Sequence, residues 1–231
     1  MTSVKVVRIP VGYTNVFLWV NGNHSVLIDT GIKNHASYIL SKMEKHGVEA
    51  SDLALIIQTH THFDHSGNTA ELKKRTGAKV VVHEKEADCL EKGYTRIPNG
   101  TNLYTKFIAS LGRKVYPNLA AYQAIKPDIM VSDKYSLAEW GIDGYILPTP
   151  GHTEGSQSVV LENRVVIAGD CFFPVYPKSV FPPFGNDVPQ LLKTWKIIFD
   201  LNIDEIYAGH GPRLSRERGV ACYEKKIKSN Q

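Results

Sequence analysis

Histidine and aspartate side chains cluster in the stretch 59–65, which reads THTHFDH. It follows a run of apolar residues that predicts a buried strand, so the polar side chains come off the loop at the end of that strand. Because side chains alternate along an extended segment, His60 and His62 point to the same side and can bind one cation. Asp64 and His65 follow a bend and can reach a second point nearby. Imidazole and carboxylate groups are ligands of zinc and of other first-row metals, so this stretch predicts a metal site.

Further histidines and aspartates lie in short motifs elsewhere in the chain. They are Asp29 in LIDTG, His152 in PTPGHT, Asp170 in IAGD and His210 in AGHG. Together with the His-x-His-x-Asp-His pattern of residues 60–65, and in this order, these motifs resemble the metallo-β-lactamase superfamily. The resemblance spans about residues 15–212. It implies an α/β fold, a four-layered αββα sandwich, and we expect residues 1–231 to form a single domain of this type.

The resemblance also implies how the ligands divide between two divalent cations. The first set is His60, His62 and His152, the second set is Asp64, His65 and His210, and Asp170 bridges the two. We expect zinc, with iron, manganese or nickel as alternatives, because the same ligands accept all of these metals. The resemblance makes Asp29 an acid that orients a ligand imidazole or the metal loop, as outer carboxylates do around metal sites. Capping of a helix or turn is its alternative role.

A pair of divalent cations indicates a hydrolytic reaction. Such a pair lowers the pKa of a shared water, and it can polarise a carbonyl or phosphoryl oxygen and stabilise a leaving group. Asp64 is placed to accept a hydrogen bond from the nucleophile, and we expect it to be the catalytic residue. No serine or cysteine nucleophile is then needed, and we expect Cys171 to be a small buried residue. We therefore predict a metal-dependent hydrolase that cleaves an ester, lactone or thioester of a small organic substrate.

Departures from the patterns of related proteins narrow this prediction. Flavodiiron oxygen reductases carry an acid where this chain has His62, and true metallo-β-lactamases lack the bridging carboxylate of Asp170. Acyl-homoserine lactonases place a tyrosine where this chain has Phe173. Glyoxalase II enzymes read Asp-His-x-Gly-Gly, whereas residues 64–68 read DHSGN. The RNA-binding arm of the processing nucleases is not evident.

Two other activities fit the same ligands. A phosphodiesterase that acts on a small nucleotide would use both cations. A mononuclear-iron sulfur dioxygenase would need only His60, His62 and His152. A catalytically silent binding module is disfavoured, because no ligand position is lost.

Composition and charge restrict the partners. The chain has 231 residues, 42% of them hydrophobic and 22% charged, which are values of ordinary globular proteins. The formal net charge is only +4, and the basic groups at 73–75 and 225–226 are too sparse for a nucleic-acid footprint. No signal peptide or membrane span is evident, so we expect a cytoplasmic protein that binds neither nucleic acid nor membrane. The three cysteines are far apart, which fits a reducing compartment.

Hydrophobic periodicity and turn residues predict the elements that carry these motifs. The expected strands cover residues 4–11, 15–20, 25–29, 53–57, 79–83, 134–137, 145–147, 158–161, 165–168 and 205–207, with a hairpin turn at 21–23. The expected helices cover residues 35–46, 68–74, 84–90, 102–111, 189–201 and 215–226.

Two segments are expected to shape the surroundings of the metals. Residues 93–127 are rich in Tyr, Pro, Gly and Asn, and we expect either a cap beside the metal site, a contact in a homodimer, or a surface excursion with its own small core. Residues 172–184 are rich in aromatic residues and proline and predict a stiff apolar wall over the metals, with core packing as the alternative. Within that wall, Tyr176 and Lys178 are candidates for a substrate contact or a proton donor.

Overall fold

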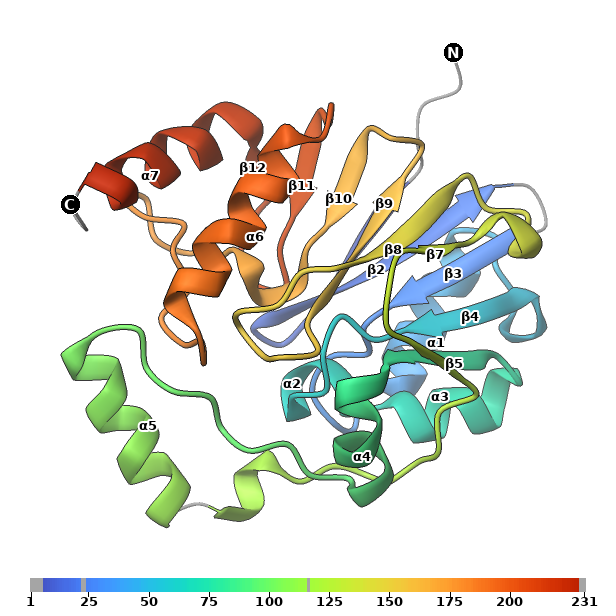
Figure 1. Cartoon of the computed structure of the whole chain (residues 1–231). Helices are drawn as coiled ribbons and strands as arrows, with labels where there is room; N and C mark the ends of the chain where they lie inside the picture. Colours follow the sequence, from blue (N-terminus) through green and yellow to red (C-terminus); the bar gives the residue numbers. More distant parts are fainter. Residues whose placement is uncertain (1–5, 22–23, 116, 229–231) are drawn as a thin grey trace.

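Two β-sheets pack face to face in the computed structural model of the protein, and helices cover both outer faces (Figure 1). The structure describes residues 6–21, 24–115 and 117–228. This arrangement confirms the predicted four-layered αββα sandwich. The expected strand residues 4 and 5, and residues 22 and 23 of the expected hairpin turn, lie outside the described residues.

The first sheet has six strands in sequence order, β1-β2-β3-β4-β5-β6. Their bounds are β1 Val6–Val11, β2 Thr14–Asn21, β3 His24–Ile28, β4 Leu53–Ile57, β5 Lys79–His83 and β6 Ile129–Val131. The first three strands are antiparallel, whereas β3, β4, β5 and β6 run parallel. The carboxyl ends of β3 and β4 therefore lie side by side, and the motifs at Asp29 and at 59–65 meet at one edge of the sheet.

The second sheet has six strands in the order β12-β11-β10-β9-β8-β7. Their bounds are β7 Tyr135–Ser136, β8 Gly144–Pro148, β9 Gln157–Leu161, β10 Val165–Ile167, β11 Glu205–Tyr207 and β12 Leu214–Ser215. All neighbours are antiparallel except β10 and β11. This parallel pair brings the turns that carry Asp170 and His210 together, and the turn between β8 and β9 adds His152.

Helices α1, α3 and α4 pack on the outer face of the first sheet, and α6 packs on the outer face of the second, with α7 beside it (Figure 1). The helix bounds are α1 Ala36–Lys45, α2 Phe63–Ser66, α3 Thr69–Thr76, α4 Glu84–Lys92, α5 Leu103–Val115, α6 Val188–Asp200 and α7 Arg216–Lys228. Capping residues set two of the helix ends. The Asp187 carboxylate accepts from the Gln190 N–H at the start of α6, and Gly77 ends α3 with a φ of 76°.

Strand alternation distributes the core between the layers. On β2, Phe17 and Trp19 face the second sheet, whereas Val16 and Leu18 face the helices on the other side. All four side chains are buried, so β2 is apolar on both faces, as a strand between two layers must be. The interior of the sandwich thus holds the two sheets, and with them the site, in a fixed relation.

Most predicted elements are present with ends shifted by one to four residues, and β4, β5 and β11 have the predicted bounds. Two short strands, β6 and β12, were missed. The predicted helix at 102–111 extends to Val115 as α5, which lies apart from the helices that cover the sheets (Figure 1). Among the described residues, none of the helices is both long and apolar enough to cross a membrane.

Candidate metal centre

The turns at the ends of β4, β8, β10 and β11 bring seven predicted ligands together. Three groups of potential donors have all their ligand atoms within 4.8 Å of one another. The groups are His60, His62 and His152; His60, His65 and Asp170; and Asp64, His65 and His210. The structure thus brings every predicted ligand to one place, although the residues come from positions 60–210 of the chain.

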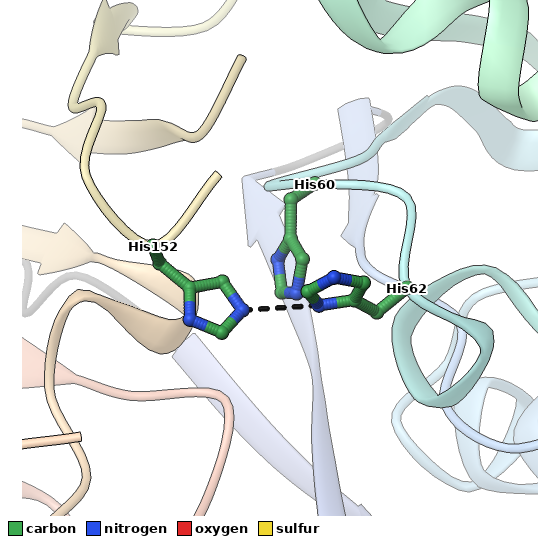
Figure 2. A group of neighbouring side chains, drawn as sticks. All are labelled: His60, His62 and His152. Carbon is green, nitrogen blue, oxygen red and sulfur yellow. Dashed lines mark hydrogen bonds between the residues drawn. The ribbon is translucent and has the colours of Figure 1, made fainter. Parts of the chain in front are cut away.

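The first group consists of three buried imidazoles (Figure 2). His62 Nδ1 lies 3.0 Å from His152 Nε2, and the rings of His60 and His62 are nearly perpendicular, at 88°. His152 Nδ1 faces the Phe184 carbonyl oxygen at 3.0 Å, which leaves its Nε2 free to act as a ligand. The three rings therefore converge edge-on with lone-pair positions facing a common point.

Asp170 lies between His152 of the first group and His65 and His210 of the third. One carboxylate oxygen, Oδ1, lies 3.3 Å from His65 Nε2. The other, Oδ2, lies 3.3 Å from His210 Nε2 and 3.7 Å from His152 Nε2. Because a carboxylate has two oxygens that can bind separate partners, this position suits a bridge between two cations.

Buried polar atoms without partners mark the same place. Within the described part of the chain, the Nε2 atoms of His60, His62 and His65 and the Oδ1 atom of Asp170 have no hydrogen-bond partner. Burial of an unpaired polar atom costs about 1–3 kcal/mol. Three of these residues, His60, His65 and Asp170, have their ligand atoms within 4.8 Å of one another and form a nitrogen and oxygen donor set that fits divalent metal ions of the zinc type.

The electrostatics divide the histidines into two kinds. Burial, with the neighbouring imidazoles, lowers the pKa values of His60 and His62 well below their ordinary value, and burial lowers that of His152. These three rings are therefore neutral, which is the form that binds a metal.

The other histidines lie beside carboxylates. Burial acts against protonation of His65, but Asp170 and Asp29 outweigh it and raise its pKa well above the ordinary value. Asp170 outweighs burial at His210 in the same way. Although burial favours the neutral acid, His210 and His65 hold the pKa of Asp170 well below its ordinary value. A negative carboxylate thus stands at the centre of the cluster, where a cation is favoured.

Comparison with known proteins identifies the family. The profile described as the metallo-beta-lactamase superfamily matches residues 9–210. The chain belongs to the metallo-beta-lactamase superfamily.

Relatives with similar sequences carry general names. A "Probable metallo-hydrolase" of Methanocaldococcus jannaschii is 30% identical over 205 residues, which are 87% of this chain and 89% of that protein. Another of the same name from Streptococcus pyogenes is 28% identical over 214 residues, 91% of this chain and 82% of the relative. The match to the "Beta-lactamase-like protein 2 homolog" of Drosophila melanogaster is 25% identical over 210 residues, 91% of this chain but only 62% of that protein.

Solved structures share the fold. The B3 metallo-beta-lactamase BLEG-1 superposes with a TM-score of 0.73 at 22% identity, covering 94% of this chain and 97% of that one. An archaeal superfamily protein from Sulfolobus tokodaii gives a TM-score of 0.68 at 20% identity, covering 98% of this chain and 87% of the other. At these identities the likeness concerns the metallo-beta-lactamase fold alone.

Asp29 lies beneath the metallo-beta-lactamase ligands, where the sequence placed it. Its Oδ2 accepts from His65 Nδ1 at 2.8 Å and from the Thr59 hydroxyl at 2.8 Å, and its Oδ1 accepts from the Thr59 N–H at 2.7 Å. The first of these contacts fixes the His65 tautomer with Nε2 available to a metal. The same carboxylate thus contacts His65 and holds the turn before His60, and its role at a metal site stays a prediction.

Glu86 supports the turn of His60 and His62 and was not among the predicted site residues. This residue of α4 is 4% exposed, and its Oε2 accepts from both the N–H and the hydroxyl of Thr61, the residue between His60 and His62. The Thr95 hydroxyl donates to the Thr61 carbonyl oxygen at 2.6 Å. The His-x-His turn is therefore held from two other segments. In the sequence Glu86 is one of several helix glutamates, and no local signal distinguishes it.

The turn between β1 and β2 supports His210. The Tyr13 carbonyl oxygen lies 3.0 Å from His210 Nδ1, and the Tyr13 ring stacks on the imidazole with 5.9 Å between centroids. Burial, together with Asp64 and Asp170, raises the pKa of Tyr13 to about 12, so its hydroxyl stays protonated at neutral pH. Tyr13 was not among the residues predicted for the site, because its contacts with His210 come from the distant end of the chain.

Gly209 is required by close approach. A Cβ atom at this position would lie 2.4 Å from both Asp170 Oδ1 and His65 Cε1. The absence of a side chain lets the backbone of the turn before His210 lie against the Asp170 carboxylate.

A cavity of about 660 Å³ opens over the ligands. His62, Asp64, His152, Asp170 and His210 contribute to its lining. Its apolar lining includes Pro10, Phe63, Ile97, Pro98, Ile108, Ala109, Phe173, Val175, Pro182, Pro183 and Phe184. The predicted apolar wall at 172–184 is thus present in part.

The two predicted substrate contacts lie elsewhere. Tyr176 and Lys178 are exposed and do not line the cavity, whereas Phe173 and Val175 of the same segment do. A bridge between Tyr176 and Ser179 marks a tight turn at this point. The chain therefore turns away from the cavity just after Val175.

Proposed function

We propose that the protein is a metal-dependent hydrolase that binds two divalent cations and cleaves an ester, lactone or thioester of a small, largely apolar substrate. The observation that carries the proposal is the position of the Asp170 carboxylate at the base of an apolar-walled cavity, where it lies against His152 on one side and against His65 and His210 on the other. The relatives named as metallo-hydrolases agree with the general class. Zinc is the metal we expect from the donor set.

The ligand sets we propose are those of the resemblance. His60, His62 and His152 would hold one cation, Asp64, His65 and His210 the other, and Asp170 both. When bound, such cations supply a water of lowered pKa and polarise the substrate carbonyl oxygen.

Asp64 is the proposed catalytic residue of this chain. Its carboxylate lines the cavity and is partly exposed, at 14%, so it can accept a hydrogen bond from a nucleophilic water and orient it. The nearest thiol is unsuited to attack, because Cys171 is buried, donates toward the Thr149 carbonyl oxygen, and has its pKa raised to about 12 by burial. Water is therefore the nucleophile that the site favours.

The charge of the cavity favours a carbonyl substrate over a nucleotide. Among the described residues that line it, Arg8 is the only cationic side chain. A nucleotide carries several charges and is usually recognised by clusters of arginine or lysine. An apolar cavity of this volume suits a small organic molecule of one or no charge.

Helix α5 supports the expectation of a cap. Ile108 and Ala109 from this helix line the cavity together with Ile97 and Pro98. We propose that residues 93–127 cover the substrate. A role of this segment in a homodimer contact stays a prediction. The cytoplasmic location of the protein also stays a prediction.

The experiment combines metal analysis with a substrate panel. Protein purified without added metal is analysed for metal content, then assayed with carboxylic esters, lactones, thioesters and a chromogenic phosphodiester before and after chelation. We expect about two metal equivalents and turnover of a carbonyl substrate that is lost in His62→Gln and kept in His46→Ala, which changes an exposed histidine outside the site.

Other results would overturn the proposal. Metal-dependent turnover of the phosphodiester alone would favour the phosphodiesterase. One iron per chain with thiol-dependent oxygen uptake would favour the sulfur dioxygenase. No turnover by the metal-loaded protein on any carbonyl substrate would contradict hydrolysis of this class.

A further inference from the structure

Arg8, the one arginine or lysine among the described residues that line the cavity, lies on the edge strand β1. Ile9 and Val11 of this strand are buried in the core under the helices, so the alternate residues Arg8 and Pro10 face the other side, where both line the cavity. A guanidinium group thus stands on a wall that is otherwise mostly apolar.

Hydrogen bonds orient this guanidinium group. Arg8 Nε donates to the Asn15 side-chain oxygen at 2.8 Å. The amide nitrogen of Asn15 donates to the carbonyl oxygens of Ala208 and Gly211, each at 2.9 Å, so its oxygen can only face Arg8. Asn15 is 3% exposed and bonds the backbone on both sides of His210. Arg8 is therefore held on the same wall as a proposed metal ligand.

Among the described residues, no carboxylate neutralises the charge of Arg8. No carboxylate of the described residues lies within 4.0 Å of its side chain, and no hydrogen bond is present from its terminal nitrogens. By contrast, Arg164 forms an ion pair with Asp204. The two Nη groups of Arg8 thus remain available in a fixed direction, which suits a planar, singly charged anion.

We propose that the substrate carries a carboxylate, remote from the bond that is cleaved, and that Arg8 binds it. This inference rests on the proposed function, since it names the substrate class of the same site. The apolar wall would hold the hydrocarbon between the two ends of the substrate. One charge-assisted, bidentate contact made by this exposed side chain accounts for about a 10- to 100-fold preference.

Matched substrates test the proposal. Aryl esters of straight-chain acids of about four to eight carbons are compared with their ω-carboxy analogues, using the zinc-loaded protein. We expect the ω-carboxy ester of the best length to have a kcat/KM about 10- to 100-fold higher than its neutral partner. In Arg8→Met the ratio of the two kcat/KM values should fall to about one, through a higher KM for the ω-carboxy ester. Arg164→Met, which removes an arginine outside the cavity, should keep the preference.

Binding separates this proposal from the hydrolytic one. The zinc-loaded protein is titrated with straight-chain monocarboxylates and with dicarboxylates of the same lengths. If a dicarboxylate binds more tightly than the monocarboxylate of the same length, and Arg8→Met removes this difference, the anion site is supported even when no ester is cleaved. In that case only the proposed hydrolysis is contradicted. The role of Arg8 would be overturned if the wild type showed equal kcat/KM and equal affinity for charged and neutral compounds. It would also be overturned if Arg8→Met lowered these values equally for both.

Discussion

Replacement of Asp29 by asparagine should lower the affinity of one proposed metal site, because it changes which nitrogen of His65 carries the proton. Asp29 has a φ of 60°, in the left-handed region that asparagine tolerates better than other residues with a side chain, so the backbone should keep its conformation. The asparagine side chain, however, has one acceptor oxygen where the carboxylate has two. If that oxygen keeps the Thr59 N–H, an amide NH₂ faces His65 Nδ1. His65 must then hold its proton on Nε2, the atom that would bind the metal.

The size of the effect follows from the contacts that are lost. The carboxylate accepts from His65 Nδ1 and from the Thr59 hydroxyl with the same oxygen, each at 2.8 Å. Loss of a charge-assisted hydrogen bond costs about 1.5–3 kcal/mol. This range agrees with the 10- to 100-fold loss of metal affinity that is typical when the partner of a ligand histidine is removed. We expect a loss of about this size for the cation bound by Asp64, His65 and His210. The cation bound by His60, His62 and His152 should keep its affinity within a few-fold.

Competition with a chromophoric chelator measures the two affinities in stepwise titrations. The control is Asp133→Asn, which makes the same chemical change at an exposed position away from the cavity. Asp29→Asn with both affinities and kcat equal to the wild type would refute the argument that Asp29 sets the His65 tautomer. A large, equal fall in both affinities with loss of thermal stability would show a general structural role instead.

Two further predictions concern the supports and the charges of the site. Glu86→Ala leaves the buried Thr61 N–H without an acceptor and should lower the free energy of unfolding by about 2–4 kcal/mol in urea titrations. Glu86→Gln, which keeps the shape and one acceptor, should lose less, and the exposed Glu84→Ala should lose little; equal losses in all three would contradict the role of Glu86. The second prediction is that the chelated protein loses stability as the pH falls below about 6.5. In this range the histidines of the unfolded chain take up protons, whereas His60, His62 and His152 of the folded protein stay neutral because their pKa values are lowered. The raised pKa values of His65 and His210 act in the opposite sense, with stabilisation complete below 6.5 and lost at higher pH. His62→Gln should therefore reduce the loss by up to about 1.4 kcal/mol per pH unit between pH 6 and 5, and an unchanged slope would show that His62 is not held neutral.

The ligands were predictable because their positions follow from strand geometry. His60 and His62 lie on one side of an extended segment at the end of a buried strand, and the structure brings their rings to 4.6 Å between centroids. Asp170 and His210 each follow a short apolar strand and precede or follow a glycine. Such local patterns fix where a side chain leaves the sheet, and the superfamily resemblance supplied the order of the turns.

Residues whose roles depend on distant partners could not be predicted in this way. Glu86 becomes important only because α4 packs beside the His-x-His turn, and the same helix carries glutamates that face solvent. The strands β6 and β12 have three and two residues and are defined by pairing with β5 and β11, not by an alternation of their own. For Tyr176 and Lys178, the composition of the segment was informative, but the turn after Val175 decides which residues line the cavity.

The supports of the site come from separate elements, and this separation has a functional consequence. Asp29 after β3 orients His65, Glu86 on α4 holds the turn of His60 and His62, and the β1–β2 turn fixes His210. Each proposed ligand set thus has its own support, while Asp170 lies against residues of both proposed sets. Loss of one support should disturb one cation position, whereas loss of Asp170 should disturb both. Because Arg8 is oriented by Asn15, which also holds the His210 turn, the proposed carboxylate contact is tied to the same cation position as Asp64. A substrate bound at Arg8 would therefore be placed relative to Asp64, the residue proposed to orient the nucleophile.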